Sequence, residues 1–323
     1  TVEVSLIRAL KTGRNVIAYL KGKGDKTVFV GAHYDHLGYG EYGNSRYIGE
    51  PQIHNGADDN ASGVALMLAL AGELKASKKL KHNYIFIAFS AEELGLLGSK
   101  AYVNNKLYNL YKPIYMMNFD MVGRLNDKNE LGLYGTGTSS AWDSVLALVD
   151  TSNFVINRNP SGMGSSDHTS FYLNKVPSIH FFSGTHEDYH KPTDDEEKIN
   201  YEGIEMILDM AIETCLALDK SKGINYNKTK SGKSRKAPSF KVTLGIVPDY
   251  FGDAKGLKID GVSPGKPAEK AGLQKGDIIT KLGAKEVKDM MTYMGALAAF
   301  DKGDKTTVEV IRAGKSISFD IEF

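Results

Sequence analysis

Residues 28–35 read VFVGAHYD, an apolar run that ends directly in His33 and Asp35. In open α/β sheets, functional side chains gather beyond the carboxyl ends of the strands. Three further apolar runs end in residues of the metal-ligand type. These are Glu92 and Glu93 after residues 84–90, Asp120 after residues 114–119, and His186, Asp188 and His190 after residues 179–182. Four such junctions in one region predict a single polar site along one edge of a sheet.

The first 219 residues alternate between short apolar runs and longer helix-like stretches. This alternation is typical of an α/β fold with a largely parallel, mixed sheet sandwiched by helices. Strands are predicted at residues 15–20, 27–31, 84–90, 114–119, 131–134 and 176–182. Helices are predicted at residues 61–75, 95–104, 141–151, 166–174 and 201–219. We therefore assign residues 1–219 to one α/β domain.

The pattern changes after residue 219. Residues 220–239 are rich in lysine and arginine and hold little to bury. They predict a solvated basic linker, with a segment for an anionic partner as the alternative. Residues 240–323 return to β-rich sequence with one clear helix at residues 290–300, which predicts a second, small domain.

Composition narrows the class of protein. A chain of 323 residues exceeds one ordinary core and suits two domains. The net charge of +1 gives no strong attraction to nucleic acid, and no apolar run approaches the roughly 18 residues that span a bilayer. Cys215 is the single cysteine, which excludes an internal disulfide and a thiolate-rich metal site.

Residues 56–63 read GADDNASG and precede an apolar helix. An Asp or Asn at such a place often caps the helix, which is the interpretation we favour for Asp59 or Asn60. Capping does not explain two consecutive carboxylates after a glycine. Because a helix N-terminus keeps a nearby carboxylate ionised, Asp58 is a good candidate to bridge two cations.

Together these motifs resemble peptidase family M28, the co-catalytic zinc aminopeptidases, whose fold is the zinc exopeptidase fold. The resemblance covers nearly all of residues 12–205. The motifs that carry it are His33-x-Asp35, GADDNASG at 56–63, Glu92-Glu93, Asn118-Phe119-Asp120 and DYHKPTD at 188–194. The eight-residue motif and the Glu-Glu pair are specific, whereas His-x-Asp alone is weak.

The resemblance implies a site with two Zn²⁺ ions. His33 and Asp120 bind one ion, Glu93 and His190 bind the other, and Asp58 bridges both. Such imidazole and carboxylate ligands suit Zn²⁺, with Mn²⁺ or Co²⁺ as substitutes. The resemblance also implies a cis peptide at Asp58–Asp59.

Three further residues receive catalytic or supporting roles from the resemblance. Asp35 is expected to orient the His33 imidazole. Glu92 is expected to be the general base that takes a proton from the metal-bound water and passes it to the leaving amine. Tyr189 is the candidate for a hydrogen bond to the tetrahedral intermediate, with ordinary packing as the alternative.

The remaining polar residues of the region leave alternatives open. His186 either binds substrate or braces its loop. His168, His36 and His54 are expected near or in the pocket, and His180 in the core. The acidic run that starts at Asp194 is read as a solvated helix start, or as negative charge near the cleft.

Residues 259–279 resemble a PDZ domain of the bacterial protease type, and the match continues to Phe323. Leu244-Gly245-Ile246 resembles the loop with which such domains hold a peptide's C-terminal carboxylate. Capture of a peptide C-terminus and packing against the peptidase cleft are equally open interpretations.

The leading functional prediction is an aminopeptidase for peptides with a free N-terminus. One alternative is a carboxypeptidase or dipeptidase-like hydrolase, for which Arg124 is the one suspected carboxylate-binding residue. The other is a non-enzymatic peptide-binding protein, which the complete ligand set and Glu92 argue against. The chain begins without Met on strand-like residues 2–7. We therefore expect a piece of a longer precursor. The family resemblance, whose members often carry a signal peptide, implies export to the periplasm or beyond.

Overall fold

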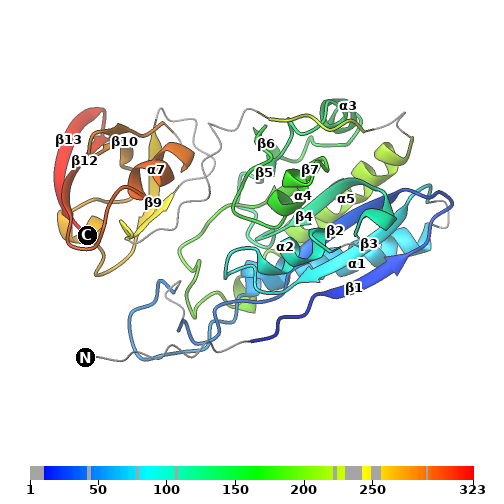
Figure 1. The fold of residues 1–323 in the computed structure, drawn as a ribbon, viewed down its shortest axis with the longest axis horizontal. Helices are drawn as coiled ribbons and strands as arrows, with labels where there is room; N and C mark the ends of the chain where they lie inside the picture. The colour runs from blue at the N-terminus through cyan, green and yellow to red at the C-terminus, as the bar shows by residue number, and fades with distance from the viewer. Residues whose placement is uncertain are drawn as a thin grey trace, which may run out of the picture.

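The computed structural model describes residues 11–41, 45–77, 80–105, 108–220, 224–229, 242–248, 256–288 and 290–323. The expected strand-like start at residues 2–7 and most of the predicted basic linker lie outside these residues. Figure 1 shows two lobes, a larger one built from the described residues up to Lys220 and a smaller one that contains the C-terminus.

The larger lobe is built on a seven-stranded mixed sheet with the order β1-β3-β2-β4-β7-β5-β6. The neighbours β3, β2, β4 and β7 are parallel, whereas β1 pairs antiparallel with β3 and β5 pairs antiparallel with β7. The strands are β1 (Val16–Leu20), β2 (Thr27–His33), β3 (Asn83–Phe89), β4 (Pro113–Phe119), β5 (Glu130–Tyr134), β6 (Val155–Asn159) and β7 (Ser178–Phe182). The four parallel neighbours therefore end at one edge of the sheet.

Helices cover both faces of this sheet (Figure 1). They are α1 (Gly63–Ala76), α2 (Leu97–Val103), α3 (Ala141–Leu146), α4 (His168–Leu173) and α5 (Tyr201–Lys220). All of β2 is buried, and its alternate side chains serve two cores. Val28 and Val30 pack with residues of α1, α3 and α5, whereas Phe29 packs with Phe171 of α4 and Val103 of α2. A strand buried on both faces reads as a continuous apolar run, as residues 28–32 do.

The smaller lobe is a β-rich domain with its own core. Its sheet has the order β13-β12-β10-β9-β8, and β11 pairs with β10. The elements are β8 (Ile246–Pro248), β9 (Leu257–Val262), α6 (Pro267–Ala271), β10 (Ile278–Leu282), β11 (Lys285–Glu286), α7 (Met290–Leu297), β12 (Lys305–Arg312) and β13 (Lys315–Glu322). The guanidinium of Arg312 binds the buried carboxylate of Asp277 through Nε and Nη2, at 2.6 and 2.7 Å.

The predicted α/β class and the six predicted strands of the larger domain are confirmed, with shifts at their ends. Neither β6, which is short and half exposed, nor α6, a helix of five residues, was predicted. Helix α3 ends at Leu146 rather than near residue 151. No helix among the described residues is both long enough and apolar enough to cross a membrane.

Candidate metal centre

The structure brings the residues predicted at the sheet edge together. His33 is the last residue of β2, and Asp120 follows β4 directly. Glu92 and Glu93 lie in the loop after β3, and His190 lies in the loop after β7. Parallel pairing brings these four strand ends together, because each strand enters the shared edge in the same direction.

Asp59 occupies the centre of this group. Its Oδ1 lies 3.2 Å from Nε2 of His33, and its Oδ2 lies 3.3 Å from Nε2 of His190. Each imidazole also faces a second carboxylate: Oδ1 of Asp120 is 3.4 Å from His33, and Oε2 of Glu93 is 3.4 Å from His190. The side chains thus form two similar candidate metal positions, one at His33 and Asp120 and one at His190 and Glu93, and both share Asp59.

The structure thus corrects the expectation that Asp58 is the bridging residue. Oδ1 of Asp58 accepts the backbone N–H of Gly123 at 2.6 Å and the Ser62 hydroxyl at 3.0 Å, while Oδ2 faces Nε2 of His186 at 3.1 Å. The cause is a break in the turn 57–62, where Asp59 has φ −108° and ψ 82°, outside the helical range. The two neighbouring carboxylates therefore point in different directions.

The cis peptide bond also stands one residue later than expected, at Asp59–Asn60. The turn is held by Asp194, whose Oδ2 accepts the backbone N–H groups of both Asp58 and Asp59 at 3.0 Å. Asp194 is fully buried, so it is not part of a solvated helix start. Because Asp194 begins an acidic run, the sequence did not distinguish it from solvated carboxylates, although it holds the turn at 57–62.

The two shared positions fit zinc ions. Ligand nitrogen and oxygen atoms lie about 2.0–2.2 Å from Zn²⁺ in a tetrahedral site, so two of them on one ion are about 3.3 Å apart. The four nitrogen–oxygen separations around Asp59 run from 3.2 to 3.4 Å. A charge-assisted hydrogen bond between the same atom types is typically shorter, at about 2.7–2.9 Å. The donor set of imidazole and carboxylate is also the one zinc accepts.

The charge around the two positions is strongly negative. Burial disfavours a charged imidazole, but hydrogen bonds to Asp59 and Glu93 outweigh burial and raise the pKa of His190 to about 10. Burial likewise opposes a charged His33, yet Asp120 and Glu92 raise its pKa well above the usual value. A proton on either imidazole thus competes with a cation for the same carboxylates.

Asp35 contacts His33 mainly through its backbone carbonyl, and its carboxylate has other partners. Its carboxylate accepts the backbone N–H groups of Glu92 at 3.0 Å and Glu93 at 3.3 Å, and lies 3.8 Å from Nδ1 of His33. The closer partner of that nitrogen, at 3.0 Å, is the backbone carbonyl of Asp35. A carbonyl only accepts, so Nδ1 carries the proton and Nε2 faces the metal position. The Asp35 carboxylate instead fixes the Glu92–Glu93 loop.

The side chain of Glu92, in this loop, is buried. Burial is the main cause that raises its pKa well above the usual value, with Asp120, Asp167 and Glu93 adding to it and His33 opposing it. Such a carboxylate holds a proton more readily than an exposed one, which suits a group that must accept and return it.

The other expected site residues lie around the centre. The Tyr189 ring stacks on the His190 imidazole with centroids 3.9 Å apart. His186 contacts Asp58, which agrees with loop bracing. His168 is fully buried and stacks on His180 at 4.6 Å, so it lies in the core rather than in a pocket. Nη2 of Arg124 binds Asp188 at 3.0 Å.

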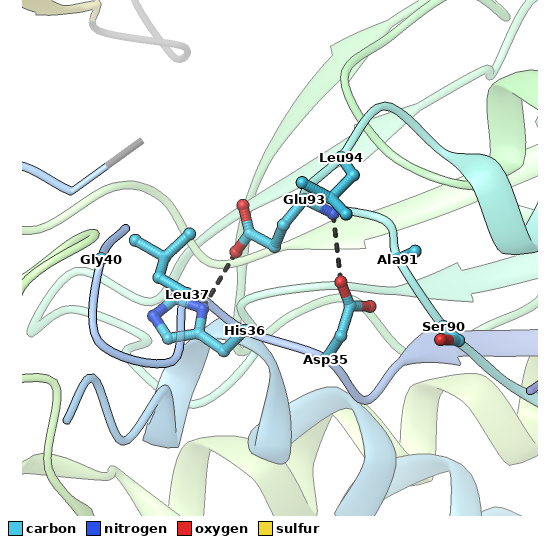
Figure 2. Close-up of a pocket in the computed structure, with 8 residues that line it drawn as sticks. All are labelled: Asp35, His36, Leu37, Gly40, Ser90, Ala91, Glu93 and Leu94. Atoms are coloured by element: carbon cyan, nitrogen blue, oxygen red, sulfur yellow. Dashed lines mark hydrogen bonds and ion pairs between the residues drawn. The ribbon is translucent and has the colours of Figure 1, made fainter. Parts of the chain in front are cut away.

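A cavity lies beside two residues of the Glu92–Glu93 region, His36 and Glu93. A pocket of about 160 Å³ opens beside Asp35, His36 and Glu93, as Figure 2 shows. His36 was expected only as pocket lining, yet its Nδ1 lies 2.9 Å from Oε1 of Glu93. His54 lies next to it, with ring centroids 6.4 Å apart, and pairs with the Ser45 hydroxyl at 2.7 Å.

The predicted carboxylate loop of the smaller domain is ordered by backbone contacts. Leu244 is buried in the core, Gly245 has φ +79°, and Ile246 begins β8. The N–H of Ser263 donates to the carbonyl of Gly245 at 2.8 Å. A ligand-binding role for the three residues stays a prediction.

Comparison with known sequences identifies the family to which this chain belongs. The fold and the paired imidazole–carboxylate positions define a metallopeptidase-like α/β domain. The sequence model of peptidase family M28 matches residues 15–215, and that of the PDZ domain matches residues 223–323. The chain belongs to peptidase family M28 and carries a PDZ domain.

Individual relatives agree with this assignment. Aminopeptidase YwaD of Bacillus subtilis is 33% identical over 213 residues, which are 62% of this chain and 43% of that protein. The probable lipoprotein aminopeptidase LpqL of Mycobacterium tuberculosis is 28% identical over 57% of this chain and 37% of that protein. The solved structure of BSAP, a zinc aminopeptidase from Bacillus subtilis, has a TM-score of 0.52 at 28% identity and covers 68% of this chain and 51% of that chain. The match thus spans less than half of these two curated relatives.

Proposed function

We propose that the chain is a two-zinc aminopeptidase that removes residues from peptides with a free N-terminus. The observation that carries the proposal is the Asp59 carboxylate, which offers one oxygen to each of two imidazole–carboxylate pairs. We assign His33 and Asp120 to the first ion, His190 and Glu93 to the second, and Asp59 to both. The names of YwaD and BSAP support the same activity.

Two zinc ions, when bound, would lower the pKa of the attacking water and polarise the scissile carbonyl. The protein's own part is proton transfer and positioning. We assign Glu92 as the base that accepts the water's proton on its carboxylate and returns it to the leaving amine. Asp35 keeps Glu92 in place by accepting its backbone N–H at 3.0 Å. Tyr189, stacked on His190, is retained as the candidate hydrogen-bond donor to the developing oxyanion.

The proposal is tested with the zinc-loaded protein on matched free-amine and N-acetylated peptides. We expect release of N-terminal residues from the free-amine peptides alone. Glu92→Gln should lose turnover while zinc content, measured by mass spectrometry, stays at two ions per chain. Cleavage of blocked peptides would favour a carboxypeptidase-like activity instead. Two bound ions without any turnover would favour a peptide-binding protein.

For the PDZ domain, we propose that it shapes the cleft as well as binding a peptide C-terminus. The support is a continuous set of hydrogen bonds. The N–H of Arg46 donates to the carbonyl of His190 at 2.9 Å, and its Nε donates to the Ser263 hydroxyl at 3.3 Å. Ser263 in turn donates its N–H to Gly245 of the predicted carboxylate loop.

This role predicts coupling between the two domains. A peptide with a free C-terminal carboxylate and a blocked N-terminus should change kcat/KM for a short substrate. Arg46→Gln should reduce that change without removing peptide binding, which is measured by calorimetry. An unchanged kcat/KM at saturating peptide would leave the PDZ domain a separate binding module. We keep its bounds at 240–323, after a linker at 220–239 and a peptidase domain at 1–219.

We also propose export to the periplasm or beyond, supported by the similarity to LpqL, a probable lipoprotein aminopeptidase. Fractionation of cells that make the full-length protein tests this. Recovery in the cytoplasmic fraction alone would contradict export.

A further inference from the structure

We infer that His36 is a positioning residue that fixes the Glu93 carboxylate, so that one oxygen serves the second metal and the other is held by the protein. This inference rests on the proposed two-metal function. His36 directly follows Asp35, so consecutive residues hold the Glu92–Glu93 pair. The Asp35 carboxylate accepts the backbone N–H groups of the Glu92–Glu93 pair, and His36 holds the Glu93 side chain (Figure 2).

The two oxygens of Glu93 have different partners. Oε1 lies 2.9 Å from Nδ1 of His36, and Oε2 lies 3.4 Å from Nε2 of His190. A carboxylate with one oxygen engaged by an N–H donor offers its other oxygen to a cation. His36 therefore selects which oxygen of Glu93 faces the metal and restrains the carboxylate from turning.

The contact is a hydrogen bond rather than joint ligation of one ion. Two ligand atoms on a tetrahedral zinc are about 3.3 Å apart, and 2.9 Å is the distance of an N–H···O⁻ bond. The distance from Nδ1 of His36 to Oδ2 of Asp59 is 3.8 Å, longer than the 3.2–3.4 Å separations around His33 and His190. Because the ionised carboxylate of Glu93 only accepts, the proton must sit on Nδ1 of His36.

The His36 ring is locked in the orientation that this bond requires. Its side chain is 8% exposed, and Nε2 is buried with no hydrogen-bond partner among the described residues. On one side it meets His190 edge-on, with centroids 5.8 Å apart. On another side it packs on Gly56, where a Cβ would come within 2.7 Å of Cγ of His36. Among the described residues, the Glu93 carboxylate is the one hydrogen-bond partner within 3 Å of this buried ring, so the bond to Glu93 is what offsets most of its burial.

Two substitutions separate the hydrogen bond from the volume of the ring. Asparagine places an amide N–H close to the position of Nδ1, so His36→Asn should keep the bond to Glu93. His36→Leu fills similar space without a donor. We expect His36→Leu to weaken one of the two metal-binding steps by about 10–100-fold, whereas His36→Asn stays within a few-fold of wild type. The other binding step should stay unchanged in both variants.

The measurement is zinc release from the full chain in buffers with chelators of graded strength, with zinc counted per chain. His54→Leu is the matched control. His54 is also buried, but it bonds Ser45 and the Gln52 carbonyl rather than a metal-site carboxylate. It should leave both zinc-binding steps unchanged. If His36→Leu does not fold, His36→Gln replaces it, because its amide lies one bond further out and should bind zinc more weakly than His36→Asn.

The outcomes separate the two proposals. A wild-type chain that holds fewer than two zinc ions overturns the two-metal function itself. A wild-type chain with two ions, together with a folded His36→Leu that binds both equally well, overturns the role of His36 alone. A folded His36→Asn that loses one ion entirely also overturns it, because His36 would then be a direct ligand.

Discussion

Oδ2 of Asp194 accepts the backbone N–H of Asp59 at 3.0 Å, and it accepts the N–H of Asp58 at the same distance. The loop after β7 thereby holds the turn between β2 and α1, although the two segments are 135 residues apart. Asp194 touches neither predicted metal position directly. It fixes the backbone from which Asp59 reaches both of them.

Asp194→Ala is therefore expected to destabilise the fold and to weaken zinc binding at both positions. Two buried N–H groups would lose a charged acceptor, which costs about 2–4 kcal/mol in total. Asp194→Asn keeps an acceptor oxygen and should cost clearly less. Urea unfolding with chelator and zinc titration of the folded variants check this. Equal loss in both variants would show that the negative charge, rather than the acceptor, matters.

Exchange of one carboxylate for an amide distinguishes Asp59 from Asp58. Asp59→Asn should weaken both zinc-binding steps by more than about 100-fold, because a shared ligand is lost. Asp58→Asn should keep both zinc ions within roughly 10-fold, since its carboxylate faces Ser62, Gly123 and His186. The reverse order of effects would restore Asp58 as the bridging residue. Zinc stoichiometry after dialysis gives the answer.

Sequence patterns predicted the sheet edge and the residue types, but not the direction of each side chain. At four of the strand ends or motifs, only one residue was the candidate ligand, and the fold brings these residues together as expected: His33, Glu93, Asp120 and His190. Asp58 and Asp59 are adjacent carboxylates, and only the break in the turn at Asp59 decides between them. The contacts of Asp194 and His36 join segments distant in sequence, and a single sequence carries no signal for them.

The stacked histidines in the core give a pH dependence of stability. Burial is the main cause that lowers the pKa of His180 to about 4, and burial and His180 lower that of His168 well below its usual value. Both are neutral in the fold, whereas the unfolded chain protonates them near pH 6.5. Their contribution to stability is thus complete above pH 6.5 and is lost as the pH falls toward 4. The loss from His180 is on the order of 3 kcal/mol by pH 4.

Urea unfolding of the zinc-free protein between pH 7 and pH 4.5 measures this slope without metal release. His180→Phe removes one titrating group and should flatten the slope, even if it lowers the stability at pH 7. A slope identical to that of the wild type would mean that other groups, such as the buried carboxyls, set the pH dependence.

Cys215 should report on unfolding of the peptidase domain. Its side chain is fully buried on α5, and its Sγ lies 3.5 Å from Sδ of Met117. Burial raises the pKa of its thiol to about 12. At pH 8 the native thiol should therefore resist an alkylating reagent that labels the unfolded chain completely. Mass spectrometry against time measures the labelling. Rapid labelling of the native protein would contradict the packing of α5 on β4.

Two glycine-to-alanine exchanges should act with opposite sign. Gly56 has φ +65°, and a Cβ there would lie 2.4 Å from the carbonyl oxygen of Asp59 and 2.7 Å from the His36 ring. Gly56→Ala should cost more than about 1–2 kcal/mol, because the left-handed backbone alone costs that much. It should also weaken zinc binding, since the clash moves the turn that presents Asp59.

Gly72 is the matched control for this effect. It lies exposed inside α1, and a Cβ there meets nothing within 4 Å. Gly72→Ala should stabilise the domain by about 0.5–1 kcal/mol through helix propensity and leave zinc binding unchanged. Chemical unfolding and zinc titration of both variants give four values. Equal zinc binding by Gly56→Ala and Gly72→Ala would contradict this prediction. It would mean that the turn at 57–62 can shift without moving the Asp59 carboxylate.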